Sequence, residues 1–223
     1  MMKHKHLLPL LILLCTAAVS MVDGIIMPGY AVKSAAKIVL FGLVPALYAG
    51  TTGISLRGLF QMERRELHRV VLLGIAVYTL ILGGYFVLRN VADFSGITES
   101  LTTNAGVSRE VFPIVAVYIP LVNALLEEFF FRGFAFLTLR HFFPLKFVYL
   151  FSAAVFALYH VSILQGWFSP ALYALAMAGL AVGGLLFDWL DSRTGSLLPS
   201  YFVHMSANLA INTVGLILFG FIG

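Results

Sequence analysis

The stretch VFPIVAVYIPLVNALLEEFFFRGFAFLTL, residues 111–139, decides the fold class of this chain. A helix that spans a membrane needs about 20 mostly apolar residues, and this run is longer than that. Its charged side chains are those of Glu127, Glu128 and Arg132. The stretch therefore predicts a membrane-spanning helix that carries charged groups inside an apolar run.

The composition of the whole chain agrees with a membrane protein. Hydrophobic residues make up 61% of its 223 residues and charged residues 11%, whereas a soluble domain has about 45–50% apolar and about 25% charged residues. This excludes a soluble globular domain, a disordered chain and a nucleic-acid-binding protein, because too few charges are present to cover a water-facing surface. The single cysteine, Cys15, excludes a disulfide framework and a cysteine-rich metal site.

Six further apolar runs lie on either side of the central one. With it, they predict an all-α fold, a polytopic transmembrane helical bundle of about seven spans. The predicted spans are residues 7–22, 38–54, 70–88, 111–139, 145–164, 170–190 and 197–222. Residues 7–22 follow Lys3 and Lys5 and could also be a secretory signal peptide, but we favour a retained span because the rest of the chain is membrane-embedded.

Basic residues predict the orientation of the spans, because they concentrate in cytoplasmic segments. A cytoplasmic N-terminus places most of them inside. The inner residues are then Lys3, Lys5, Arg57, Arg64, Arg65, Arg69, Arg132, Arg140, Lys146 and Arg193, and the outer ones are Lys33, Lys37, Arg89 and Arg109. Residues 89–110 form the longest outer loop. The short chain without eukaryotic targeting signals suggests a bacterial plasma membrane.

Ionisable side chains inside spans are costly and are candidates for functional sites. Glu128 and Arg132 are one helical turn apart and can pair, whereas Glu127 points about 100° away. Two more groups are FALYH at residues 156–160 and HMSAN at residues 204–208. Taken singly, each group could be structural: an ion-pair cluster, a core histidine or a polar contact between helices.

The depth of these groups in the membrane favours a common site. At about 1.5 Å per helical residue, Glu127 lies roughly 20 Å above Arg140. On the same rise, His160 lies roughly 21 Å above Lys146. His204 lies roughly 16 Å above Arg193. Three separate helices are therefore predicted to bring their ionisable groups to a similar level.

The three groups resemble the motifs of a known family. Glu-Glu-x-x-x-Arg at 127–132, Phe-x-x-x-His at 156–160 and His-x-x-x-Asn at 204–208 are similar, in this order, to those of the CPBP family. This is the Abi and CAAX-protease family of intramembrane endopeptidases, which includes the Ras-converting CAAX endopeptidase. The resemblance implies that residues 111–223 form the catalytic core and residues 1–110 form N-terminal spans and loops of the same bundle.

The resemblance also implies roles for individual residues at a buried proteolytic site open toward the cytosol. The residues implied to be catalytic are Glu127, His160, His204 and Asn208, and those implied to orient the site are Glu128, Arg132 and Phe156. Glu127 would activate a water molecule that His160 also holds. His204 and Asn208 would stabilise the oxyanion of the tetrahedral intermediate.

The cofactor stays open, because the family has been described both as metalloproteases and as metal-independent glutamate peptidases. Amide hydrolysis needs an activated water and donors aimed at the developing oxyanion. If a divalent metal such as zinc is present, Glu127, His160 and His204 would be its ligands with water as the fourth. The sequence has no His-Glu-x-x-His helix, and we favour metal-free activation.

Expected partners are membrane lipid and a peptide or protein substrate, which could be lipid-modified; no nucleic acid is expected. Gly179 and Gly183 predict close helix approach within the bundle, with a dimer through this stripe as the alternative. Asp188 and Asp191 are predicted to be exposed at the interface. The competing functions are a non-catalytic membrane scaffold or immunity protein, and a small proton-coupled transporter that uses Glu127 and the histidines.

Overall fold

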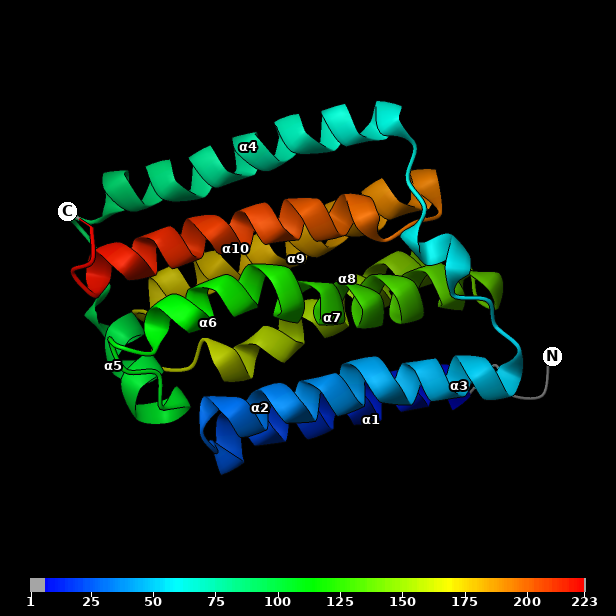
Figure 1. Cartoon of the computed structure of the whole chain (residues 1–223), viewed down its shortest axis with the longest axis horizontal. Coiled ribbons are helices and arrows are strands. Elements are labelled where there is room, and N and C mark those ends of the chain that lie inside the picture. Colours follow the sequence, from blue (N-terminus) through cyan, green and yellow to red (C-terminus); the bar gives the residue numbers. More distant parts are fainter. Residues whose placement is uncertain (1–6, 223) are drawn as a thin grey trace.

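The computed structural model describes residues 7–222, so that Lys3 and Lys5 lie outside the described residues. All regular secondary structure within residues 7–222 is helical. Figure 1 shows the long helices running side by side along the longest axis of the molecule. The predicted all-α bundle is confirmed.

The first two spans form a helical hairpin at one edge of the bundle (Figure 1). The elements of the hairpin are α1 (Leu7–Met21), a π-helical turn (Val22–Ile26), α2 (Tyr30–Lys37), a π-helical segment (Ile38–Leu43) and α3 (Val44–Thr52). In α1, Leu8, Ile12, Cys15 and Val19 are buried inside the protein, and retention of this segment as a span stays a prediction.

The second span begins earlier than the sequence predicted. It runs from Tyr30 to Thr52 instead of starting at residue 38. Lys33 and Lys37 belong to its helix, so the predicted start of this span at residue 38 is wrong. The physical reason is that a helix can carry lysines through an apolar layer when their charges face the interior of the bundle and find partners there.

The third span and the outer loop come next along the chain. A 3₁₀ turn (Arg57–Phe60) leads into α4 (Arg64–Leu88), and the predicted loop of residues 89–110 contains a further helix, α5 (Ser95–Ala105). The chain leaves α5 at Gly106, whose φ of +65° is the left-handed conformation that glycine adopts without steric cost.

The central stretch forms one helical rod from Phe112 to His141. Its segments are α6 (Phe112–Tyr118), a π-helical segment (Ile119–Asn123), α7 (Ala124–Glu128), a second π-helical segment (Phe129–Thr138) and a 3₁₀ turn (Leu139–His141). Pro120, which cannot donate the backbone hydrogen bond of a regular helix, lies in the first π-helical segment. The rod therefore continues past Pro120, and the motif Glu127-Glu128 lies in α7 between two widened segments.

The last three spans are α8 (Leu145–Ile163), α9 (Pro170–Thr194) and α10 (Leu198–Leu218). Helix α8 packs against α1 and α9, and α10 packs against α4 and α9. Gly195, with φ of +72°, ends α9 and turns the chain into α10. The rod and α8 to α10 together form the part of the bundle that holds the three motifs.

Close packing of α8 on α9 depends on one glycine. A Cβ atom on Gly184 would lie 3.1 Å from the Cα atom of Ala153, so the two helices touch at this point. The same atom on Gly179 or Gly183 would meet nothing within 4 Å. The prediction that Gly179 and Gly183 bring helices together is therefore wrong, because they face the other side of α9. Association into a dimer stays a prediction.

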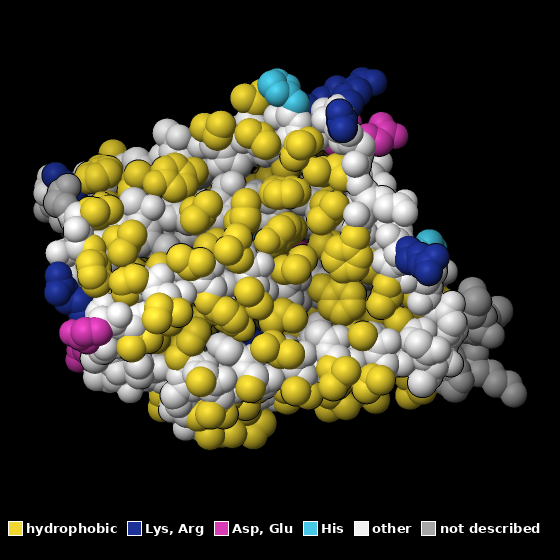
Figure 2. All heavy atoms as spheres, in the orientation of Figure 1, with side chains coloured by type: hydrophobic (Ala, Val, Ile, Leu, Met, Phe, Trp, Pro, Cys, Tyr) yellow, Lys and Arg dark blue, Asp and Glu magenta, His cyan; other side chains and the backbone are white. Residues whose placement is uncertain are grey.

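The surface of the bundle matches its apolar composition. Within residues 7–222, seven helices are long and apolar enough to cross a membrane. Figure 2 shows hydrophobic side chains over most of one face, with charged side chains gathered toward its two ends. The chain is an integral membrane protein with a polytopic helical fold.

Candidate active site

The candidate site is built around the adjacent acids of α7. Glu127 and Glu128 are both buried, and the rod around them is packed with aromatic side chains. Phe130 and Phe131, two and three residues beyond Glu128, are fully buried, and Phe130 stacks on Phe41 of the second span at 4.2 Å between ring centroids. This packing fixes the rod, so that each acid keeps a defined direction.

The two carboxylate oxygens of Glu127 have different surroundings. Oε1 accepts hydrogen bonds from Asn123 Nδ2 at 2.7 Å and from the Tyr159 hydroxyl at 3.2 Å. Oε2 faces His160 Nε2 at 3.9 Å and His204 Nε2 at 3.8 Å. One oxygen is therefore held by the protein, and the other faces two imidazoles from α8 and α10.

The protonation of the two imidazoles follows from their outer partners. His160 Nδ1 lies 2.8 Å from the Phe156 carbonyl oxygen, and His204 Nδ1 lies 2.7 Å from Glu128 Oε1. A carbonyl or carboxylate oxygen accepts hydrogen bonds, so each Nδ1 is the protonated nitrogen. In the singly protonated ring, Nε2 then keeps its lone pair and points toward Glu127. The distances of 3.8 and 3.9 Å exceed a direct hydrogen bond and suit a bridging water.

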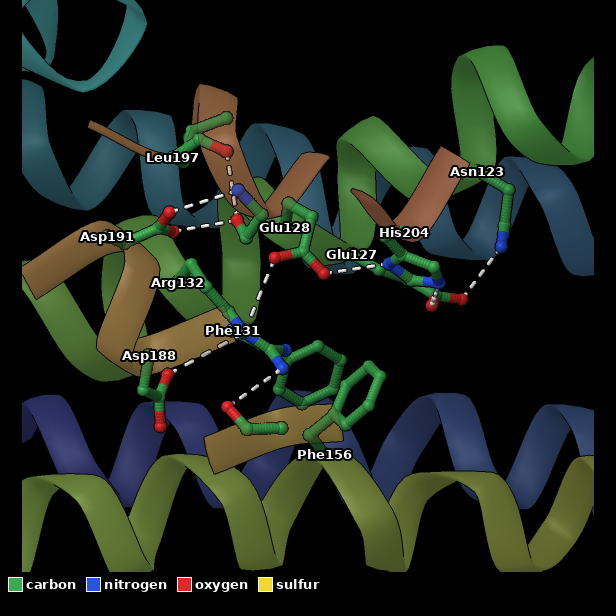
Figure 3. A network of polar contacts seen from close by, with 12 residues as sticks. Asn123, Glu127, Glu128, Phe131, Arg132, Phe156, Asp188, Asp191, Leu197 and His204 are labelled. Carbon is green, nitrogen blue, oxygen red and sulfur yellow. Dashed lines mark hydrogen bonds and ion pairs between the residues drawn. The ribbon is translucent and has the colours of Figure 1, made fainter. Parts of the chain in front are cut away.

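Behind Glu128 lies a second layer of charge, drawn in Figure 3. Arg132 Nε lies 3.3 Å from Glu128 Oε2 and 3.6 Å from Asp188 Oδ1. The guanidinium also lies over the rings of Phe156 and Phe187, at 4.1 and 4.9 Å from their centroids. The predicted pair of Glu128 and Arg132 is confirmed, and it supports His204 through the opposite oxygen of Glu128.

Asp188 and Asp191 lie inside the bundle, so the prediction that they are exposed at the interface is wrong. Both are fully buried. Asp188 accepts a hydrogen bond from Ser152 in addition to its contact with Arg132. Asp191 accepts hydrogen bonds from the backbone N–H and the hydroxyl of Ser200, in the first turn of α10 (Figure 3). Hydropathy could not reveal these partners, because they come from other parts of the chain.

Lys37 and Asp23 are site residues that the sequence reasoning missed. Lys37 Nζ lies 3.9 Å from Glu127 Oε1 and 3.6 Å from Asp23 Oδ2. Both come from the N-terminal hairpin, far from the three motifs in sequence. The available signal was the spacing of Lys33 and Lys37, which places both on one face of a helix if the second span is extended toward residue 30.

Asn208 and Phe156 have different surroundings. Asn208 lies one helical turn beyond His204 on α10 and is partly buried, and its side chain forms no hydrogen bond with any residue from 7 to 222. Phe156 is buried between Arg132 and the ring of His160, whose centroid is 4.6 Å away. The structure thus brings together Glu127, His160 and His204, and the catalytic roles stay predictions.

The site contains carboxylate and imidazole groups, which are common ligands of metal ions. Among residues 7–222, no group of three His, Cys, Asp or Glu side chains is arranged so that it could hold a metal. One oxygen of Glu127 is engaged by Asn123 and Tyr159. Residues 7–222 thus hold no preformed three-ligand metal site, and the choice between zinc and metal-free activation stays a prediction.

Comparison with known proteins finds one family. Residues 109–210 match the family described as Type II CAAX prenyl endopeptidase Rce1-like. The matched segment contains all three motifs and excludes the N-terminal hairpin and α4. No curated protein matches the chain, and no solved structure matches it. The match confirms the resemblance that the motifs suggested.

Proposed function

We propose, from the match of residues 109–210 to the Rce1-like family of CAAX-type prenyl endopeptidases, that the chain hydrolyses a peptide bond with a water activated by Glu127. The observation that carries the proposal is the direction of Glu127 Oε2, which faces the Nε2 atoms of His160 and His204. A carboxylate and two imidazoles from three helices converge on one buried point, where a general base can act.

The first step is the activation of water. A water molecule between Glu127 Oε2 and His160 Nε2 can donate a hydrogen bond to each. Asn123 and Tyr159 hold Oε1, so Oε2 is the atom that takes the proton. The water oxygen then forms a bond with the carbonyl carbon of the substrate, and the carbonyl oxygen becomes an oxyanion.

The second step needs donors for that oxyanion. Asn208 offers an amide N–H₂. His204 offers Nε2–H when both of its ring nitrogens are protonated, with Nδ1 donating to Glu128. The proton on Glu127 passes to the amide nitrogen as the C–N bond breaks, which leaves one carboxyl and one amine product. Glu128 and Arg132 hold the His204 ring in place.

The proposed mechanism uses no metal step. Treatment of active protein with a chelator, followed by metal analysis, tests this. Activity that survives chelation supports metal-free water activation. Activity that is lost and then restored by zinc would contradict it.

The proposed substrate is a membrane-associated peptide that carries a lipid. Support comes from the family, whose description names a prenyl endopeptidase, and from the burial of Glu127 inside a bundle with an apolar outer face. The test is incubation of the purified full chain with a prenylated CAAX peptide in detergent. Mass spectrometry should find two products that add up to substrate plus one water, and neither product should form with Glu127→Ala.

The scaffold or immunity protein and the proton-coupled transporter stay as alternatives. A scaffold would bind the peptide and release it uncleaved. A transporter would give proton flux in liposomes that Glu127→Ala abolishes, without peptide products. Either outcome, obtained with well-folded protein and a range of prenylated peptides, would contradict the protease.

A further inference from the structure

The N-terminal hairpin contributes a charged residue to the candidate site, although it lies outside the segment that matches the family. We propose that Lys37 is a positioning residue for Glu127. It fixes which oxygen of the acid is held and which is left for the reaction. This inference rests on the proposed function, because it assigns Lys37 a part in the same water activation.

The first argument is the chain of hydrogen bonds from Lys37 to Glu127. Lys37 Nζ donates to Asn123 Oδ1 at 3.3 Å, and Asn123 Nδ2 donates to Glu127 Oε1 at 2.7 Å. An asparagine amide can be turned either way, and its oxygen cannot donate to a carboxylate. Because Lys37 holds the oxygen of Asn123, the amide presents its nitrogen to Glu127.

The second argument is the direct contact of the charges. Lys37 Nζ lies 3.9 Å from Glu127 Oε1, the oxygen that Asn123 and Tyr159 also hold. The ammonium group also lies 5.3 Å from the centroid of the Tyr159 ring. All three groups favour negative charge on Oε1 and keep the carboxylate from rotating. Oε2 therefore stays directed toward the imidazoles.

The third argument is that Lys37 is itself held in place. Asp23 Oδ2 lies 3.6 Å from Lys37 Nζ on the other side. The side chains of Lys37 and Asp23 are only 12% and 5% exposed, and burial of a lone cation or carboxylate is costly. Lys37 is within 4 Å of two carboxylates, those of Asp23 and Glu127, and its positive charge offsets their mutual repulsion. The hairpin thus fixes the ammonium group at one position.

Lys33 provides a matched control on the same helix. It lies one turn before Lys37, is also buried, and donates to the backbone oxygens of Asp23 and Asn104. Among residues 7–222, the Lys33 ammonium group makes no hydrogen bond or ion pair with Glu127 or Asn123. Replacing Lys33 therefore removes a buried charge from the hairpin without touching the acid.

The first experiment compares kcat and KM of the full chain on a prenylated CAAX peptide. We expect Lys37→Met to lower kcat about 10- to 100-fold with KM within about twofold, since small misplacement of a reacting group has effects of this size. Lys37→Arg should regain at least part of the loss, because it keeps the charge and the donors. Lys33→Met should stay within about threefold of the wild type. Equal losses for Lys37→Met and Lys33→Met, or a change confined to KM, would overturn the inference.

The second experiment does not depend on activity. A double-mutant cycle on the thermal unfolding midpoint in detergent combines Lys37→Met with Glu127→Gln, and Lys33→Met with Glu127→Gln. Contacting residues are non-additive, and we expect a coupling of about 2–4 °C for Lys37 and additivity for Lys33. Additivity for Lys37 would overturn the inference even if the protein is an active protease. If the wild type is inactive but Lys37 and Glu127 are coupled, the contact is confirmed and the proposed function is contradicted. The role of Lys37 in hydrolysis is then contradicted too.

Discussion

Glu127 and Glu128 are neighbours in sequence and have separate tasks, because successive residues of a helix point about 100° apart. Glu128 faces Arg132 and His204, and both of its oxygens are used. Glu127 has other partners, which hold its Oε1 atom, and its Oε2 atom is directed at the imidazoles of His160 and His204. The division explains how a buried site can contain two adjacent acids, one paired with Arg132 and His204 and one with an oxygen left for the proposed role as a base.

Arg132 is predicted to be essential for stability. Arg132→Met leaves Glu128 and Asp188 buried without their cation, and loss of one partner from a buried ion pair costs about 3–5 kcal/mol. The unfolding midpoint in detergent should fall clearly. The control is Arg69→Met, whose pair with Glu66 is exposed and should contribute about 0–1 kcal/mol. Equal effects of the two substitutions would contradict the buried pair.

Asn208 is predicted to act on the rate of hydrolysis and not on the fold. Asn208→Ala should lower kcat about 10²–10³-fold, the usual effect of removing one oxyanion donor, and leave KM and the unfolding midpoint nearly unchanged. Asn212→Ala is the matched control, because Asn212 is buried and donates to the Ala116 carbonyl. It should lower the midpoint more than kcat. A rise in KM alone for Asn208→Ala would contradict the oxyanion role.

Among individual residues, the sequence identified those whose helical spacing or motif indicates a partner or a role. The pair of Glu128 and Arg132 follows from helical periodicity, and the meeting of Glu127 with the histidines follows from their equal depth. Asp188 and Asp191 were wrongly predicted to be exposed, and Lys37 was missed. Whether a charged side chain can be buried depends on partners from distant segments of the chain. Ser152 and Ser200 are such partners, and no local pattern links them to α9.

Among the elements, the rod and the contact of α8 with α9 set the geometry of the site. The acids lie in a short α-helical segment between two π-helical segments, and π-helical turns are frequent at functional sites. Gly184 of α9 touches Ala153 of α8, and its carbonyl oxygen lies 3.5 Å from Arg132 Nη2. The close approach of α8 and α9 therefore helps to hold Arg132 in place, as well as His160 on α8.

Gly184 and its neighbour Gly183 provide a sharp test of this contact. Gly184→Leu should lower the unfolding midpoint and the activity, because its Cβ would lie within 3.4 Å of Ala153 and Phe156, and overpacking costs about 1–3 kcal/mol. Gly183→Leu should change both little, because nothing lies within 4 Å of its Cβ. Equal tolerance of leucine at both positions would mean that α8 and α9 do not touch there.

Element boundaries were predictable where apolar residues continue without interruption. The span at residues 145–164 agrees with α8 to within one residue at its end. The predicted start of the second span is too far along the chain, because a hydropathy criterion assigns the segment with Lys33 and Lys37 to a loop. The helical segment α5 was predicted as a loop, because its threonines and asparagine are polar and helix propensity alone is a weak guide.

The whole molecule is organised as an apolar body with charged ends (Figure 2). The N-terminal hairpin, the rod and α8 each contribute to the surroundings of Glu127, through Lys37, Asn123 and Tyr159. The geometry of the candidate site therefore depends on the bundle as a unit. All three motifs lie after residue 110. The division of the chain into N-terminal spans (residues 1–110) and a catalytic core (residues 111–223) stays a prediction.

The orientation in the membrane is open to direct measurement. The positive-inside rule predicts that the segment around Gln61 is cytoplasmic and that α5 is external. Cysteines introduced as Gln61→Cys and Glu99→Cys are at exposed positions, whereas the native Cys15 is buried and serves as background. A membrane-impermeant maleimide should label Glu99→Cys in intact cells and Gln61→Cys only after lysis. The reverse pattern would contradict the predicted orientation.

The central claim is that Glu127 is the base that activates water. Its most direct test is the kcat of Glu127→Gln on a prenylated CAAX peptide, because glutamine keeps the shape of the side chain and cannot take the proton. We predict a fall in kcat of about 10²–10⁴-fold, with Glu110→Gln, at an exposed position outside the bundle core, unchanged within about twofold. Wild-type turnover by folded Glu127→Gln protein would contradict the account.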